Sequence, residues 1–250
     1  MALFTGVFRS QALSHDTAFN IIIPEDCPRE DMTTVYLLHG MHGDHTGWCR
    51  KTGIERYAQE RRIAIVMPDG ENGFYNNMKY GKNHYTYVAK ELVDYTRKIF
   101  RLSTKRENTF ICGLSMGGYG AFRLALMKPE QYAAAASLSG CVDIVSRLQV
   151  CKWTNEAAAI WGDDFRTCTK GTDADLMELV DRLEQDPTRQ KPRLFSCCGK
   201  QDSLYADNLT FRDFMKDKSF DYTFEDGDGI HNWVFWDQWV VRALDFFAEK

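Results

Sequence analysis

At the centre of the chain, residues 109–120 read TFICGLSMGGYG. The apolar run Thr109–Cys112 is typical of a buried strand, and the run Met116–Met127 is typical of a helix. Between them, Gly113–Gly117 matches G-x-S-x-G, a pattern in which a serine sits on a tight strand-to-helix turn. Glycines leave room where the strand and the helix nearly touch. The segment predicts that Ser115 projects its hydroxyl as a nucleophile, and the alternative is a serine that only caps the helix.

Several apolar strand-like runs lie on either side of this segment and are separated by helix-like runs. Continuous apolar strands are typical of a parallel sheet that is buried on both faces. The alternation therefore predicts the α/β class, with a mostly parallel central sheet and helices on both faces. Together with the G-x-S-x-G turn, it favours an α/β-hydrolase fold. The expected strands are 35–39, 63–67, 109–112, 133–138 and 193–198, and the expected helices are 85–100, 116–127 and 232–248.

We expect residues 1–250 to form a single domain, since this length suits one α/β core. Residues 3–13 and 17–23 are predicted to form an antiparallel hairpin at one edge of the sheet. Residues 141–190 have no obvious strand, although they contain two tryptophans and a helical run from Asp173 to Leu183. We interpret this segment as a cap or lid inserted over the carboxyl edge of the sheet.

Composition excludes several classes of function. The net charge of -4, without a dense basic cluster, argues against nucleic-acid binding. No segment is long and apolar enough to span a membrane, and no secretory signal is visible, so we expect a cytoplasmic protein. The eight cysteines include no C-x-x-C pair and several lie in apolar runs. We therefore expect free buried thiols rather than disulfides or a zinc site.

A serine nucleophile needs a base, and His231 is the histidine that follows Ser115 in the chain. The order Ser, Asp, His is typical of α/β-hydrolases. His231 follows a strand-like run and a glycine-containing loop, which is where this fold holds its base. The alternative interpretation is a surface or helix-capping histidine.

The third member of the triad should be a carboxylate between these two residues. Asp202 follows the buried run 193–198, so a loop at the carboxyl end of that strand would bring it to the edge that holds the serine. It would fix the imidazole tautomer and stabilise the imidazolium. Asp207, Asp226 and Asp228 are the alternatives, and a helix N-cap is the structural alternative for Asp202.

The run His39–His45 follows an early strand and reads HGMHGDH. We expect it to supply the second oxyanion donor, with the backbone N–H groups of Met41 and Met116 forming the oxyanion hole. A metal site is the alternative interpretation of this run, because His39, His42 and His45 recur every three residues and Asp44 precedes the last of them. Two glycines interrupt that run, so we predict no metal there. His15 and His84 are predicted to be polar surface or loop residues.

Taken together, the segments YLLHGM (36–41), MPDG (67–70), GLSMGGYG (113–120), CGKQD (198–202) and HNW (231–233) resemble the esterase D family. The family includes S-formylglutathione hydrolases and the bacterial tributyrin, acetyl and feruloyl esterases. The chain is most similar to the tributyrin-esterase branch. It resembles the S-formylglutathione hydrolases less, because their loop after the early strand usually has an apolar–Thr–Cys sequence, whereas here the loop is rich in histidine. The resemblance implies a triad of Ser115, Asp202 and His231, no cofactor, and Met41 and Met116 as oxyanion donors.

The sequence therefore predicts a carboxylic ester hydrolase that acts through an acyl-enzyme on short-chain acyl (acetyl or butyryl) or feruloyl esters. Its partner would be a small-molecule ester, with esterified carbohydrates among the candidates, and a homo-oligomer is one expected assembly. Trp48, Trp153 and Trp161 are the predicted pocket residues. The alternatives are a thioesterase of the S-formylglutathione hydrolase type, a non-catalytic binding protein with this fold, and a metal-dependent hydrolase.

Overall fold

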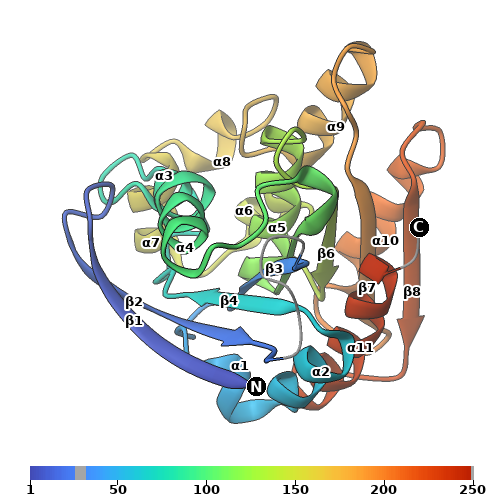
Figure 1. The fold of residues 1–250 in the computed structure, drawn as a ribbon. Helices are drawn as coiled ribbons and strands as arrows, with labels where there is room; N and C mark the ends of the chain where they lie inside the picture. The colour runs from blue at the N-terminus through green and yellow to red at the C-terminus, as the bar shows by residue number, and fades with distance from the viewer. Residues whose placement is uncertain (26–31, 249–250) are drawn as a thin grey trace.

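The computed structural model describes residues 1–25 and 32–248, which fold around one eight-stranded sheet (Figure 1). Its strand order is β1-β2-β4-β3-β5-β6-β7-β8. The pairs β1–β2 and β2–β4 are antiparallel and the other neighbours are parallel. The strands are β1 (Ala2–Ser10), β2 (His15–Ile23), β3 (Thr34–Leu38), β4 (Ala64–Pro68), β5 (Thr109–Leu114), β6 (Ala134–Leu138), β7 (Arg193–Gly199) and β8 (Tyr222–Gly227).

Helices cover both faces of this sheet (Figure 1). Side chains of α1, α2 and α11 share one buried apolar cluster, and those of α4 to α10 belong to the cluster on the opposite face. The helices are α1 (Gly47–Lys51), α2 (Ile54–Arg61), α3 (His84–Thr86), α4 (Val93–Phe100), α5 (Met116–Met127), α6 (Ile144–Val150), α7 (Thr154–Trp161), α8 (Phe165–Cys168), α9 (Leu176–Gln185), α10 (Tyr205–Met215) and α11 (Trp233–Ala248), with a π-helical turn η2 (Tyr87–Leu92) and a 3₁₀ turn η3 (Arg106–Asn108).

The parallel strands are apolar along their whole length because both of their faces are buried. In β3, Tyr36 and Leu38 belong to one cluster, while Val35 and Leu37 belong to the other. Alternate side chains of a strand point to opposite faces, so a strand covered on both sides needs apolar residues at every position. The predicted α/β-hydrolase fold, with its mostly parallel sheet and its helices on both faces, is confirmed.

The predicted N-terminal hairpin is present as β1 and β2, whose register runs from the pair Ala2–Ile23 to the pair Ser10–His15. A carboxylate of the helical segment packs under its turn. Glu91, in the π-helical turn η2, accepts hydrogen bonds from the Ser10 hydroxyl (2.5 Å) and the Ala12 N–H (2.9 Å). These bonds fix the hairpin to the helical run that the sequence predicted over residues 85–100.

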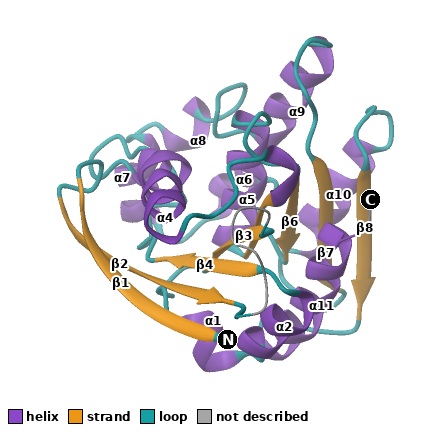
Figure 2. Cartoon of the chain, in the orientation of Figure 1, coloured by secondary structure: helices purple, strands orange, loops and turns teal. Residues whose placement is uncertain are grey.

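The segment 141–190 folds as four helices, α6 to α9, between β6 and β7 (Figure 2). Helix α9 packs on α5, and its residues Leu176, Leu179, Val180 and Leu183 are buried in the cluster that α5 also supplies. The insertion is therefore anchored to the layer of helices that contains α5.

Seven cysteines lie in the described part of the chain, and all seven are free, while Cys27 lies outside the described residues. Five of the seven are buried. Within the same described residues, no helix has the combination of length and apolar character that crossing a bilayer requires.

Candidate active site

Ser115 occupies a strained turn between β5 and α5. Its backbone angles are φ 55° and ψ −118°, a region that side-chain-bearing residues rarely adopt. The turn also brings α5 against the end of β3, where a Cβ added to Gly117 would lie 2.6 Å from the His39 carbonyl oxygen and 2.7 Å from that of Leu38. Neither oxygen can move away without a shift of the backbone, because both belong to the main chain. The second glycine of the motif is thus required by close packing.

His231 lies on the loop between β8 and α11, and its imidazole reaches the serine. The distance from Nε2 to Ser115 Oγ is 3.0 Å, and Nδ1 lies 2.8 Å from Asp202 Oδ2. Because a carboxylate only accepts, Nδ1 carries the proton, and Nε2 accepts from the serine hydroxyl. The ring also packs edge-on against Trp236, at 4.9 Å between centroids, which restricts its rotation.

Asp202 lies just after β7 with its side chain fully buried. Burial alone would raise the pKa of this carboxyl. Hydrogen bonds from His231 and from the Leu204 N–H (2.8 Å) outweigh that effect and hold the pKa below its usual value. Asp202 is therefore ionised at neutral pH and faces Nδ1 of His231. The side chains of Ser115, His231 and Asp202 are thus joined in one continuous chain of hydrogen bonds.

The alternative carboxylates have other partners. Asp207 forms an ion pair with Arg147 at 2.5 Å, and Asp226 accepts a hydrogen bond from the Tyr205 hydroxyl at 2.6 Å. Asp228 lies 3.4 Å from the side-chain amide nitrogen of Gln201. Among the described residues, Asp202 is thus the carboxylate that hydrogen-bonds His231.

The loop after β3 passes close over the serine. A Cβ added to Gly40 would lie 3.2 Å from Ser115 Cβ, and Met41 lines the same cavity as Ser115. The Met41 N–H has no acceptor among the described residues. Met116 is the first residue of α5, so its N–H has no acceptor within the helix. Two unpaired backbone donors therefore lie beside the serine, as an oxyanion hole requires.

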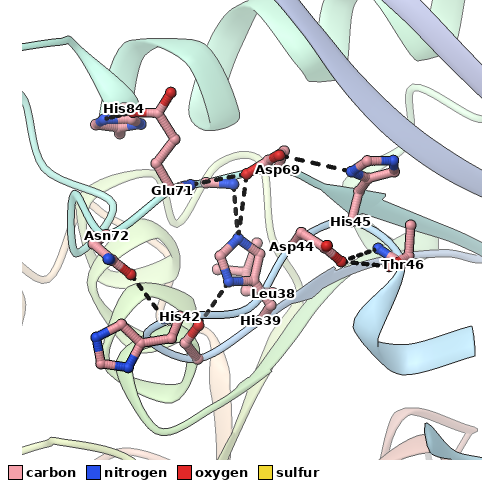
Figure 3. Close-up of polar contacts among 12 residues, drawn as sticks. Leu38, His39, His42, Asp44, His45, Thr46, Asp69, Glu71, Asn72 and His84 are labelled. Carbon is pink, nitrogen blue, oxygen red and sulfur yellow. Dashed lines mark hydrogen bonds and ion pairs between the residues drawn. The ribbon is translucent and has the colours of Figure 1, made fainter. Parts of the chain in front are cut away.

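Buried His39 holds this loop in place through hydrogen bonds of its ring (Figure 3). Its Nε2 accepts a hydrogen bond from the Gly70 N–H at 2.8 Å, so the proton lies on Nδ1, which donates to the Gly40 carbonyl at 2.7 Å. Burial lowers the pKa of His39 and keeps the ring neutral. The imidazole thus joins the loop after β3 to the loop after β4.

The three histidines of residues 39–45 do not converge. His39 has both ring nitrogens engaged, His42 directs its ring away from it, and His45 lies 3.7 Å from an Asp69 oxygen on the other side (Figure 3). Within the described residues, no group of three His, Cys, Asp or Glu side chains is arranged to hold a metal ion.

The other two histidines meet a common carboxylate. His15 and His84 lie 3.5 and 3.7 Å from Glu71. The sequence interpretation of His84 as a surface or loop residue is wrong, since His84 begins α3 and is only 1% exposed. Burial lowers the pKa of His84 to about 4. The ring of His84 packs against the backbone of Gly73. A sequence pattern does not reveal this contact.

A cavity of about 420 Å³ opens beside Ser115. Its aromatic wall consists of Trp233 and Trp236, at the start of α11. The sequence offered one signal for Trp233, since a residue two positions after the base must lie near the base. The full lining is Gly40, Met41, His42, Gly43, Lys51, Leu114, Ser115, His231, Asn232, Trp233 and Trp236.

The predicted pocket tryptophans are placed elsewhere. Trp48 is 1% exposed, donates from Nε1 to the Leu38 carbonyl at 3.1 Å, and packs behind Trp233 at 5.2 Å between centroids. Trp153 and Trp161 pack on Phe74, at 5.0 and 5.3 Å between centroids. The described part of the segment 141–190 supplies none of the residues that line the Ser115 cavity, so the wall that we expected from a lid comes from α11.

The family model described as "Putative esterase" matches residues 10–247. An acetyl esterase of Caldicellulosiruptor saccharolyticus is 30% identical over 266 aligned residues, which cover 100% of this chain and 99% of the relative.

Two solved structures from Staphylococcus aureus are similar over nearly all of both chains. Fluorophosphonate-binding serine hydrolase F (FphF), substrate bound, is 36% identical with a TM-score of 0.91 and covers 100% of this chain and 99% of its own. The S-formylglutathione hydrolase FrmB, as apoenzyme, is 36% identical with a TM-score of 0.89 and covers 99% of each chain. A ferulic acid esterase at 22% identity and a TM-score of 0.82 shares the fold.

Proposed function

The chain belongs to the esterase family and is a serine carboxylesterase. We propose that it hydrolyses esters of short acyl groups through an acyl-enzyme formed on Ser115. The observation that carries the proposal is the hydrogen-bonded chain from Ser115 Oγ through His231 to Asp202, with distances of 3.0 and 2.8 Å. This arrangement activates a hydroxyl that is otherwise a weak nucleophile.

In the acylation step, Ser115 Oγ attacks the ester carbonyl carbon while its proton passes to His231 Nε2. Ionised Asp202 stabilises the imidazolium that forms and keeps Nδ1 protonated. The carbonyl oxygen becomes an oxyanion, which the N–H groups of Met41 and Met116 stabilise. When the tetrahedral intermediate collapses, the alcohol oxygen takes the proton from Nε2 and leaves.

Deacylation repeats these steps with water as the nucleophile. His231 takes a proton from the water, the hydroxide oxygen attacks the acyl carbon, and Ser115 Oγ regains the proton as the carboxylic acid departs. Each proton that moves in this scheme passes between Ser115, His231, the departing alcohol and water, while Asp202 stays ionised.

The cavity supports acetyl and butyryl groups as the acyl part. Its apolar surface comes from Met41, Leu114, Trp233 and Trp236, and its volume of about 420 Å³ accommodates a short acyl chain together with an alcohol. Feruloyl esters and acetylated carbohydrates are the further candidates for a substrate screen. The ferulic acid esterase shares only the fold with this chain, so it gives feruloyl specificity little support.

A thioesterase activity is the second candidate, because the FrmB structure, described as an S-formylglutathione hydrolase, is 36% identical to this chain. The same triad can attack a thioester carbonyl. Measuring kcat/KM on S-formylglutathione and on p-nitrophenyl acetate would rank the two activities. A higher value on the thioester would replace the proposed oxygen-ester preference.

The direct test of the proposal is hydrolysis of p-nitrophenyl acetate and butyrate by the wild type and by Ser115→Ala. We expect the substitution to lower kcat by roughly a thousandfold or more. Ser203→Ala, which changes an exposed serine close to Asp202, is the matched control and should retain activity. Full turnover by Ser115→Ala would refute the proposal.

We also propose that the enzyme works in the cytoplasm. The support is that the seven described cysteines are unpaired, as expected in a reducing compartment. Fractionation of the source cells followed by detection of the protein would test this location, and recovery in the extracellular fraction would contradict it.

A further inference from the structure

Lys51 is the one charged side chain among the described residues that line the cavity beside Ser115. His42 and Asn232 are polar members of the same lining, which contains no described aspartate or glutamate. The chain as a whole has a net charge of -4. A lysine that lines the cavity without a neighbouring carboxylate in that lining favours a ligand that carries negative charge.

Lys51 is the last residue of α1 and has no carboxylate partner. Its Nζ lies 5.0 Å from the centroid of the Trp233 ring, a cation–π distance, and no described acidic residue pairs with it. The preceding residue, Arg50, is in contrast 3.6 Å from Asp44. The ammonium of Lys51 is therefore held over one wall of the cavity with its donors unused.

His42, in the loop between β3 and α1, adds a second donor. Its backbone has φ 63°, and its N–H donates to Asn72 Oδ1 at 2.8 Å, which fixes the residue at the rim. Its ring points away from His39 and His45 (Figure 3), and no described residue hydrogen-bonds the imidazole. Because His42 lines the same cavity, we take its imidazole as the second donor to a ligand there.

The position of Lys51 indicates which half of the ester it meets. The alcohol oxygen must take its proton from His231 Nε2, so the alcohol half has to lie beside His231. Trp233, two residues further along, forms the adjoining wall, and the Lys51 ammonium lies over that ring. The cation therefore faces the side from which the alcohol departs.

We propose that Lys51, with His42 as a second donor, selects esters whose alcohol half carries a carboxylate. This inference rests on the proposed esterase function and adds a class of substrate to it. Lys51 and His42 are specificity residues, since neither takes part in the transfer of the acyl group.

The test compares two esters of nearly the same size and shape that differ in charge. 4-Carboxyphenyl acetate is anionic and 4-carbamoylphenyl acetate is neutral, and both carry an acetyl group on a para-substituted phenol. The readout is the ratio of kcat/KM for the anionic ester to kcat/KM for the neutral ester, after each value is divided by the rate constant for hydrolysis of that ester by hydroxide, which corrects for the difference between the leaving groups. We expect the wild-type enzyme to give a ratio above one at low ionic strength, and added salt to lower that ratio.

Three substitutions of Lys51 separate charge from packing. Lys51→Met keeps the aliphatic stem over Trp233 and should lower the ratio about fivefold. Lys51→Glu should lower it further, and Lys51→Arg should restore it, because the charge is retained. Lys98→Met, on exposed α4, removes one positive charge away from the cavity and should leave the ratio unchanged.

Each outcome decides the inference. A fall in Lys51→Met, a further fall in Lys51→Glu and retention in Lys51→Arg support it. A ratio within about twofold of the wild-type value in both Lys51→Met and Lys51→Glu overturns it while leaving the esterase function intact. If the wild type turns over neither ester, the esterase function fails, and the inference fails with it.

Discussion

The Tyr75 hydroxyl donates a 2.9 Å hydrogen bond to the main-chain carbonyl of His39. His39 in turn donates from its ring to the Gly40 carbonyl, one residue before Met41. Arg123 of α5 holds Tyr75 from the other side, by a 3.0 Å bond from Nη1 to the Tyr75 carbonyl. The loop that is proposed to bind the oxyanion is thus supported by fully buried polar groups.

The first prediction concerns this support. Tyr75→Phe removes one hydroxyl and leaves a buried carbonyl unpaired, so we expect the free energy of unfolding to fall by about 1 to 3 kcal/mol. We also expect kcat on p-nitrophenyl acetate to fall more than KM changes, because the oxyanion donor would be less well positioned. Steady-state kinetics and urea unfolding provide the two measurements. An unchanged kcat would show that Tyr75 supports only stability.

A second prediction concerns Asp202. In Asp202→Asn the side chain keeps its size but no longer stabilises the imidazolium, and it favours the wrong tautomer of His231. We expect kcat to fall by roughly 10³- to 10⁴-fold with little loss of stability. Asp228→Asn is the matched control and should retain activity. A loss of less than tenfold in Asp202→Asn would contradict the assigned role.

The third prediction is a pH dependence of stability. The pKa of buried His84 is lowered from 6.5 to about 4. Above pH 6.5 this histidine is neutral in both the folded and the unfolded states. Between pH 6.5 and 4 the unfolded chain binds the proton first, so folding loses stability as the pH falls.

We expect His84 to account for a loss of about 2 kcal/mol between pH 7.5 and pH 5. Urea unfolding of the wild type and of His84→Gln at both values of pH isolates this part. The variant should be less stable at pH 7.5 and should show a smaller loss on acidification. Equal losses in the two proteins would contradict this origin of the pH dependence.

The fourth prediction concerns the glycine turn. In Gly117→Ala the new methyl group would meet two main-chain oxygens at 2.6 and 2.7 Å, and neither can move without displacing β3. We expect a loss of about 3 kcal/mol or more, or failure to fold. Gly47→Ala places its methyl group 3.6 Å from Trp233, an ordinary contact, and should fold normally. Thermal unfolding of both variants would distinguish a local clash from a general effect of adding a methyl group.

The sequence predicts the sheet well because burial on both faces leaves a clear pattern. Every position of β3 to β6 is buried, so apolar runs mark these strands without any knowledge of their neighbours. Ser115 and His231 could be identified because the turn demands glycine and a single histidine follows it. Asp202 required one further step, namely that parallel strands end at the same edge of the sheet.

The residues that line the pocket could not be predicted from strand pattern and sheet edge in the same way. Trp48 and Trp233 are in edge-on contact, yet only Trp233 lines the cavity, because the orientations of α1 and α11 decide which ring lies in front. Sequence spacing does not encode that choice. The positions of Trp153 and Trp161 could not be predicted for a similar reason, since both pack against Phe74, which lies far away in the chain.

The most direct test of the central claim is to locate the covalent adduct of a fluorophosphonate probe by peptide mass spectrometry. We predict one modified residue, Ser115, and we expect Asp202→Asn to slow labelling because His231 is then a poorer base. Labelling at another residue, or undiminished labelling of Ser115→Ala, would contradict the claim that Ser115 is the nucleophile.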